Sequence, residues 1–506
     1  MKKKRLLLSV AAILITTTVF FGIALSGTQH TNITWKGPQT CLQCHEIEAR
    51  ELHNSAHYQW QGEALHALNG PPLQGKLNTA VNSYCINILG NWNACGNCHI
   101  GLGAKPDSNV SLTQHLQNID CLVCHQKDYK RKKVNGVFVP DTANMTISMD
   151  QAVRTVHKPT RENCLQCHAR GGGGDNYKRG DLAVAHGITS DRNFDVHMAK
   201  TGANLACQSC HTVKNHRIAG RGSDLRQTDL NVQMSCSTSA CHPKMLSSKG
   251  HSSSDVNRHI NKVACQTCHI KTFARNAADT SATEATEMHR DWLKPHKTPS
   301  GVIHPTSTLV NNVKPVYRFW NMYSYGYSVG ETASIDPQTG KYPTSRPDGG
   351  INDPASKLYP FKYKTAANQP IAVKLNKLIL LDSSVYFASG DAHAAIRAGL
   401  VNMGYSANEP YSFVETDTFQ LITHQVMPKG QSLTCKECHG ATAAQMNLRS
   451  LGYTIKGSPS SVCTSCHSYK DPARMGYKSL HDEHVKDEKI DCSKCHNFTR
   501  SVNASR

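Results

Sequence analysis

The chain has 506 residues, of which 39% are hydrophobic and 18% charged, and its formal net charge is +19. Outside the N-terminal segment no stretch is long and apolar enough to span a membrane, which excludes a protein with several membrane spans. So positive a charge ordinarily indicates an anionic partner such as nucleic acid. The pattern of the 21 cysteines indicates whether an anionic partner is expected for this chain.

The N-terminus is predicted to direct export. Residues 2–5 form a basic head, and an uncharged, mostly apolar run follows over residues 6–25. This run is longer than the roughly 7–15 residues of a signal-peptide core and close to the roughly 20 that span a bilayer. Residues 1–27 are therefore interpreted either as a cleaved signal peptide or as an uncleaved membrane anchor. Both interpretations place the rest of the chain in the periplasm or outside the cell.

Twenty of the cysteines form ten attachment motifs for haem. Nine pairs have the spacing Cys-x-x-Cys, the tenth has four intervening residues, and every pair is followed at once by histidine. In this motif two thiols bind one porphyrin and the histidine ligates its iron. Zinc sites do not demand that following histidine, so the repeats predict ten covalently bound haem c groups. The motifs are Cys41, Cys44, His45; Cys95, Cys98, His99; Cys121, Cys124, His125; Cys164, Cys167, His168; Cys207, Cys210, His211; Cys236, Cys241, His242; Cys265, Cys268, His269; Cys435, Cys438, His439; Cys463, Cys466, His467; and Cys492, Cys495, His496.

The haems also account for the positive charge. Ten haems bring roughly twenty propionate charges, and Lys and Arg are expected to pair with them. A nucleic-acid partner is therefore not expected. A residual positive patch would attract a small anionic substrate.

The motifs divide the chain into four parts. Residues 1–27 are the export segment, and residues 28–270 carry seven motifs wrapped by short helices and loops. Residues 271–445 are predicted to be a haem-poor helical region that ends in the eighth motif, and residues 446–506 carry the last two motifs. The predicted fold class is mainly α with extensive irregular loops, a multihaem cytochrome c with longer helices in its haem-poor half.

Histidines outside the motifs supply second ligands. The chain has 28 histidines, ten of them in motifs, so most haems are expected to be bis-histidine and suited to electron transfer. A helix is predicted over residues 389–403, capped by Asp391 and ended by Gly404. His393 within it is interpreted either as a distal ligand or as a buried histidine. The predicted distal ligands are His197, His393, His424, His481 and His484.

Three further features are outside the haem motifs. Cys85 is the one cysteine left over, and it precedes the second motif by ten residues. Four glycines at residues 171–174 follow the fourth motif, and residues without a Cβ let the backbone lie against something large and flat. Lys178 comes shortly after them. By themselves, Lys178 indicates a solvated lysine and Cys85 a buried, inert thiol.

Several stretches resemble the octahaem tetrathionate reductase family, which belongs to the multihaem cytochromes related to hydroxylamine oxidoreductase. They are residues 118–125, the glycine run with Asp175 and Lys178, and residues 180–182, 195–198 and 356–362. The resemblance covers about residues 40 to 445 and is most specific at the glycine run. It implies that Lys178 ligates the iron of a catalytic second haem, with Asp175 and Cys85 as the other catalytic residues. A lysine ligates iron only when neutral, Asp175 could exchange protons with it, and a Cys85 thiolate could attack a sulfur–sulfur bond.

The resemblance implies a terminal reductase. Its electrons would come from a redox partner protein or a membrane quinol-oxidising complex, and tetrathionate is the leading substrate, with nitrite and hydroxylamine next. The chain departs from the family in having ten motifs instead of eight, and the last two are expected to add an electron entry or exit point. Two rival hypotheses are a non-catalytic electron-transfer conduit or extracellular wire, and a dehydrogenase that runs the chemistry in reverse.

Overall fold

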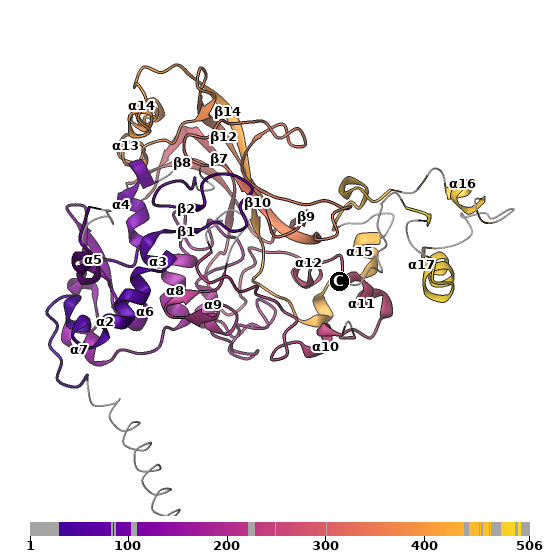
Figure 1. The fold of residues 1–506 in the computed structure, drawn as a ribbon, viewed down its shortest axis with the longest axis horizontal. Helices are drawn as coiled ribbons and strands as arrows, with labels where there is room; N and C mark the ends of the chain where they lie inside the picture. The colour runs from indigo at the N-terminus through magenta and orange to yellow at the C-terminus, as the bar shows by residue number, and fades with distance from the viewer. Residues whose placement is uncertain are drawn as a thin grey trace, which may run out of the picture.

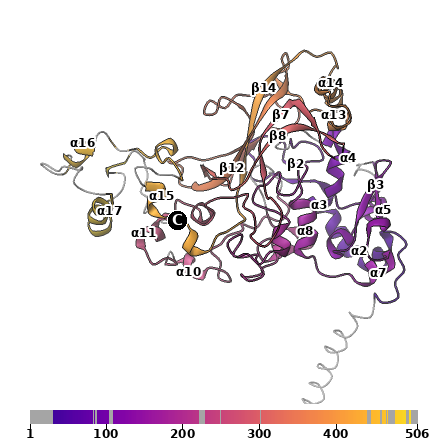
Figure 2. The same ribbon diagram turned by 180° about the vertical axis from the view of Figure 1, so that it is seen from behind.

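The computed structural model describes residues 30–81, 84, 88–102, 109–220, 228–247, 249–299, 301–439, 445–454, 456, 459–464, 466, 477–490 and 494–496. The seven-motif part is built from short helices and loops, and a sheet from later in the chain lies against it (Figure 1). The last two motifs belong to an extension that projects from this body in both views (Figure 2).

Most of the described attachment motifs are carried by short helical turns, whereas the sixth, Cys236 to His242, lies in a loop before α10. Cysteines three residues apart and a histidine directly after them lie on one face of a helix, so a single turn presents all three groups. α2, the longest helix among the described residues, is kinked at His45. α5 and α7 begin at capping boxes formed by Ser111 with Gln114 and Ser148 with Gln151. The helices of this part are α2 (Gln39–His53), α3 (Ala56–Gln59), α4 (Trp92–Cys95), α5 (Leu112–Asn118), α6 (Leu122–His125), α7 (Met149–Arg154), α8 (Arg161–His168), α9 (Ala185–Ile188), α10 (Pro243–Leu246), α11 (Ser254–His259) and α12 (Cys265–His269).

Single turns and hairpins fill the space between these helices. Each hairpin has only two strands, so the expectation of short elements and irregular loops around the motifs is met. The 3₁₀ turns are η1 (Ile88–Gly90), η2 (Gly96–Cys98), η3 (Thr142–Asn144) and η4 (Cys207–Ser209). The hairpins pair β1 (Gln61–Glu63) with β2 (Leu73–Gly75), β3 (Arg131–Val134) with β4 (Val137–Pro140), and β5 (Val213–Lys214) with β6 (Arg217–Ile218).

The prediction that residues 271–445 are mainly helical is wrong. This region forms an eight-stranded sheet in the order β10-β11-β14-β12-β7-β8, with β9 and β13 also paired to β12. The central strand β12 has an irregular run of buried and half-buried residues, rich in aromatic and β-branched side chains, which favours a strand. The strands are β7 (Thr286–Lys297), β8 (Ile303–Val310), β9 (Val316–Trp320), β10 (Ser324–Gly326), β11 (Tyr342–Pro347), β12 (Lys357–Ala372), β13 (Lys377–Leu378) and β14 (Tyr411–Leu421).

Two helices, α13 (Ser383–Ser389) and α14 (Ala392–Asn402), pack on the sheet and confirm the helix predicted near residues 389–403. Asp391 caps α14 by accepting the Ala394 N–H at 2.9 Å, and Ile396 and Leu400 are buried against Trp292 of β7. A Cβ on Gly399 would stand 2.2 Å from the Leu380 carbonyl oxygen, so the close approach of helix and sheet requires glycine there.

The C-terminal part contains η5 (Lys429–Gln431), α15 (Cys435–His439), η6 (Arg449–Leu451), α16 (Pro459–Thr464), α17 (Tyr477–His481) and the π-helical turn η8 (Asp482–Asp487). Within the described residues, every helix of the chain is too short or too polar to cross a bilayer. The export segment predicted at residues 1–27 lies outside the described residues.

Candidate functional site

The charge of Lys178 acts on both thiols of the second attachment motif, although the two are far apart in the chain. Burial raises the pKa of Cys95, and the charges of Lys76 and Lys178 oppose that rise. A hydrogen bond with Cys167 lowers the pKa of Cys98 to about 6, and the same two lysines add to the effect. Two ammonium groups therefore approach this motif. That of Lys76 also lies 5.9 Å from the ring centre of Trp60.

The histidine of the second motif has aromatic neighbours. His99 is 2% exposed, and the rings of Tyr58, Trp60 and Trp92 have their centres 5.1–5.7 Å from its own. Its Nε2 lies 2.8 Å from the Tyr58 carbonyl oxygen. Among the described residues no imidazole stacks on His99 as a second ligand would. At the second motif, a non-histidine ligand therefore fits the described surroundings.

The glycine loop is fixed by its backbone. Gly172 and Gly173 have φ values of +93° and +116°, which glycine adopts without strain. A Cβ on Gly172 would stand 1.9 Å from the hydroxyl oxygen of Tyr84. In the structure this backbone therefore lies against the ring of Tyr84, the residue that precedes Cys85 in the chain. Cys85 itself lies outside the described residues.

Asn176 ties the loop to the start of the sheet. Its side chain is fully buried, its Nδ2 donates to the Glu284 carbonyl at 2.8 Å, and its Oδ1 accepts the Leu182 N–H at 3.2 Å. The Lys178 N–H donates to the Gly171 carbonyl at 3.2 Å. These bonds set the path of the backbone that carries Lys178.

A cluster of buried charged side chains, Glu287, Arg290 and Lys364, lies on the sheet next to the same loop. Glu287 is fully buried and accepts two hydrogen bonds from Arg290, at 2.6 and 3.0 Å, and one from Ser307 at 2.6 Å. Its other oxygen pairs with Lys364. Burial by itself would raise the pKa of Glu287, but Lys364 and Arg290 outweigh it and lower the pKa to about 2. Lys364 and Arg290 also lie 3.5 and 4.1 Å from the Tyr84 ring centre.

Lys362 of β12 reaches the loop directly. Its buried Nζ donates to the carbonyls of Lys178 at 2.8 Å and Tyr177 at 3.2 Å, and to the Thr286 hydroxyl at 2.6 Å. Burial, and then the charge of Lys364, lower the pKa of Lys362 well below its usual value. One sheet surface therefore positions the residue before Cys85 and the backbone of Lys178 together.

Seven motif histidines have a second imidazole opposite them. An iron between two imidazoles, with Fe–N bonds of about 2 Å, holds the ring centres roughly 6 Å apart. The observed separations are 5.9–6.5 Å, and the described side chains therefore fit bis-histidine haem. The pairs are His45 with His30, His168 with His57, His211 with His424, His242 with His197, His269 with His251, His439 with His259, and His496 with His481.

The remaining motifs differ. His216 lies near enough to His125 of the third motif to affect its pKa, which burial lowers first. His467 of the ninth motif and Cys492 of the tenth lie outside the described residues. The Nδ1 of His484 is 3.0 Å from the Leu480 carbonyl oxygen, on the turn after α17.

The structure does not support His393 as a distal ligand. Its side chain is exposed, contrary also to the interpretation of a buried histidine, and its Nδ1 is 2.6 Å from the Tyr411 hydroxyl. No described motif histidine stands opposite it. The helical period placed His393 near the buried face of α14, but it falls just outside the stripe that packs on the sheet.

The motifs form a continuous series through the molecule. Cysteines of neighbouring motifs lie close enough to shift each other's pKa between the first and third, second and fourth, fourth and fifth, and sixth and seventh motifs. Charge interactions join the third to the fourth, the fifth to the sixth, the seventh to the eighth, the eighth to the tenth and the tenth to the ninth. The second motif lies at the end of a branch from the fourth, and the extension joins at the eighth.

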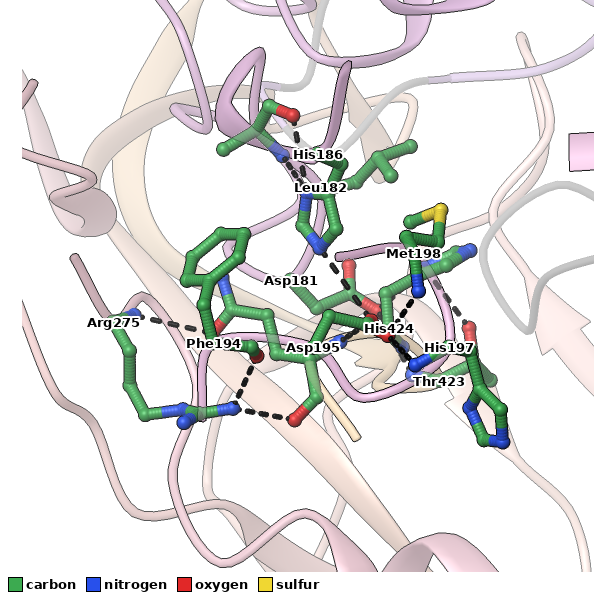
Figure 3. Close-up of polar contacts among 12 residues, drawn as sticks. Asp181, Leu182, His186, Phe194, Asp195, His197, Met198, Arg275, Thr423 and His424 are labelled. Atoms are coloured by element: carbon green, nitrogen blue, oxygen red, sulfur yellow. Dashed lines mark hydrogen bonds and ion pairs between the residues drawn. The ribbon is translucent and has the colours of Figure 1, made fainter. Parts of the chain in front are cut away.

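A buried network orients His424 and His197, two of the histidines predicted as distal ligands (Figure 3). Asp181 accepts the Thr423 and His424 N–H groups at 2.8 and 3.1 Å and lies 3.1 Å from His424 Nδ1, which leaves Nε2 for the iron. Asp195 accepts the His197 and Met198 N–H groups at 2.8 and 3.0 Å.

On the other side of the network, Arg275 donates to the carbonyls of Phe194 at 2.7 Å and Gln425 at 2.6 Å. His186 is fully buried against Asp195, with 3.7 Å between its Nε2 and the carboxylate. The stretches 180–182 and 195–198 thus contain carboxylates that fix histidines of the fifth and sixth haem sites.

Sequence reasoning missed several residues that build these sites. His30, His57, His251 and His259 belonged to the pool of unassigned histidines, and no spacing rule links a distal ligand to its motif. Glu287, Arg290, Lys362 and Lys364 are ionisable residues on strands β7 and β12 of the sheet that was predicted as helical, and Glu284 lies just before β7. Recognising the strand over residues 357–372 would have shown two lysines on inward-facing positions.

Three comparisons found similar proteins, and two of them name a cytochrome c. The family described as "Cytochrome c bacterial" matches residues 304–442. An uncharacterized protein of Archaeoglobus fulgidus is 28% identical over 239 residues, covering 38% of this chain and 77% of that protein. The crystal structure of the octahaem cytochrome c from Shewanella oneidensis is similar with a TM-score of 0.69 and 27% sequence identity, covering 86% of this chain and 97% of that chain. These likenesses relate the chain, in fold and in sequence, to multihaem cytochromes c.

Proposed function

We propose that this multihaem c-type cytochrome is an exported ten-haem reductase of a small sulfur or nitrogen oxyanion or amine, with its reaction site at Lys178 beside the second motif. The single observation that carries the proposal is this juxtaposition. Lys178 approaches the motif whose histidine has aromatic instead of imidazole neighbours. A six-coordinate bis-histidine haem has no position for a substrate, whereas an amine ligand that is more readily displaced leaves one.

The protein groups at the site have separable tasks. Haem, when bound, supplies the electrons one at a time. Lys178 would ligate as a neutral amine, and the Lys362 hydrogen bond fixes its backbone. Asp175 would exchange protons with the site, and Cys85, next to the clamped Tyr84, would act on a sulfur–sulfur bond.

Tetrathionate is the favoured substrate, on the resemblance. It takes up two electrons, its central sulfur–sulfur bond breaks, and two thiosulfate ions leave. Nitrite and hydroxylamine are the next candidates. A redox partner protein or a membrane quinol-oxidising complex would supply the electrons, and the C-terminal extension joins the series at the eighth motif, which makes it the proposed entry point.

A non-catalytic electron conduit is the second candidate. The unbroken series of neighbouring motifs favours it, because conduction needs only adjacent haems. In a conduit the second haem would be as inert as the others.

The test is the electron paramagnetic resonance spectrum of the ferric protein, with and without tetrathionate, nitrite and hydroxylamine. We expect one signal distinct from the bis-histidine haems, lost in Lys178→Ala and perturbed by a substrate. Lys76→Ala is the matched control, since Lys76 approaches the same thiols. Loss of the signal in Lys76→Ala instead would assign the ligand to Lys76. Ten bis-histidine signals that neither variant changes would refute the reductase proposal and favour the non-catalytic electron conduit.

A further inference from the structure

Glu284, three residues before Glu287, is a fully buried carboxyl group with no role in the function proposed above. Both of its side-chain oxygens are shut off from solvent, and neither accepts a hydrogen bond from an N–H or O–H donor among the described residues. The group that it contacts is the carboxyl group of Asp175, in the glycine loop. Two carboxylate oxygens in contact repel unless a proton lies between them.

The two carboxyl groups have unequal surroundings, and these decide which one carries the proton. Asp175 is half-buried, and its oxygens accept the Val184 N–H at 2.9 and 3.2 Å. Glu284 has no such donor and is completely enclosed. Burial, followed by the negative charge of Asp175 and their shared hydrogen bond, raises the pKa of Glu284 to about 8. Asp175 is the one titratable side chain, within the described residues, whose charge contributes to that shift.

The backbone keeps this pair in place next to Lys178. Asn176, between Asp175 and Lys178, donates to the backbone carbonyl of Glu284 at 2.8 Å. The Glu284 N–H in turn donates to Asn276 Oδ1 at 2.8 Å. The pair is therefore built from the loop that carries Lys178 and from the segment that enters β7, with the buried Glu284 behind the half-buried Asp175.

We infer that Glu284 and Asp175 hold one proton between them in the interior and pass it to the substrate at the Lys178 site, which suits the site to reductions that consume protons. The inference rests on the proposed function and narrows its substrate class. Tetrathionate reduction breaks a sulfur–sulfur bond with two electrons and takes up no proton. Hydroxylamine reduction breaks the nitrogen–oxygen bond with two electrons and two protons, and yields ammonia and water.

The proton moves in two steps. The Glu284 O–H bond breaks as Asp175 takes up the proton, and the protonated Asp175 then donates it to the departing oxygen of hydroxylamine. The electrons come from an external low-potential donor such as dithionite. Solvent protons restore Glu284 after each turnover, and the second proton enters the same way.

Glu284→Gln is a conservative test because its amide N–H can still donate to Asp175 but carries no transferable proton. Infrared spectroscopy of the holoprotein at pH 7, in ordinary and heavy water, should show a buried protonated carboxyl band that Glu284→Gln abolishes. Asp175→Asn should move the band. Glu415→Gln, a matched change at an exposed glutamate of β14, should leave it unaltered. A band that survives in Glu284→Gln would overturn the stored proton.

Turnover measurements test whether the proton stored on Glu284 is delivered to the substrate. With dithionite as donor, the ratio of hydroxylamine to tetrathionate turnover should fall roughly a hundredfold in Glu284→Gln, the low end of what general acid catalysis contributes. In the wild type that ratio should decline above about pH 8, where Glu284 loses its proton. An unchanged ratio would overturn the delivery. No turnover of either substrate by the wild type would refute the proposed function and the delivery together, while the infrared band would still decide whether the proton is stored.

Discussion

Neutralising Glu287 tests whether the charge cluster under the sheet holds the site together. At neutral pH Glu287→Gln leaves the ammonium of Lys364 and the guanidinium of Arg290 buried, 1% and 4% exposed, without their anion. The pKa of Glu287 is lowered from 4.5 to about 2, and at 1.36 kcal/mol per unit this corresponds to about 3 kcal/mol of stability. Breaking a buried ion pair on one side costs a similar 3–5 kcal/mol or so.

The assay is chemical denaturation followed by circular dichroism, at pH 7 and through the acid range. Because the folded pKa is depressed, the stabilisation is complete above pH 4.5 and is lost as the pH falls towards 2. Glu287→Gln should therefore converge with the wild type in acid. The exposed pair of Glu415 with Lys341 is the control, and Glu415→Gln should cost at most about 1 kcal/mol.

Adding Lys364→Met to Glu287→Gln should restore part of the loss by removing one uncompensated cation. A cost below about 1 kcal/mol at pH 7, or a difference from the wild type that persists at pH 2, would refute the view that charge balance stabilises the cluster.

Three further changes probe other parts of the molecule. Asp181→Asn removes the carboxylate from His424 and should raise the reduction potential of that haem on the order of 60 mV, as measured by spectroelectrochemistry, since the histidine becomes less basic. Gly172→Ala should lower stability by about 1–3 kcal/mol and alter the spectrum of the Lys178 site, whereas Gly340→Ala, also at positive φ but in open space, should lower stability by about 1 kcal/mol and leave the spectrum unchanged. A chain that ends after Tyr453 should bind eight haems instead of ten in a pyridine haemochrome assay and accept electrons from its partner more slowly, with dithionite reduction preserved. An equal partner rate would show that electrons do not enter through the extension.

The sequence determined the covalent chemistry of this protein. Spacing and a following histidine define each motif locally, because a single helical turn must present two thiols and an imidazole on one face. The helix at α14 was equally local: Asp391 caps it, Gly404 follows it, and the structure has it as predicted. The resemblance drew attention to Lys178, Asp175 and the leftover Cys85, whose roles stay proposals.

Only the tertiary structure decided how the motifs and the site are assembled. Candidate distal histidines such as His30 and His259 have no fixed spacing from a motif, and folding alone brings their rings opposite His45 and His439. The sheet was missed because its strands do not alternate simply between buried and exposed residues, so residues 271–445 resembled irregular helical sequence. The ionisable residues buried on the sheet and beside it, including Glu284, are of types that usually lie on the surface. Burial against the glycine loop changes their pKa. For Glu284, the loss of solvent and the neighbouring Asp175 carboxylate raise the pKa.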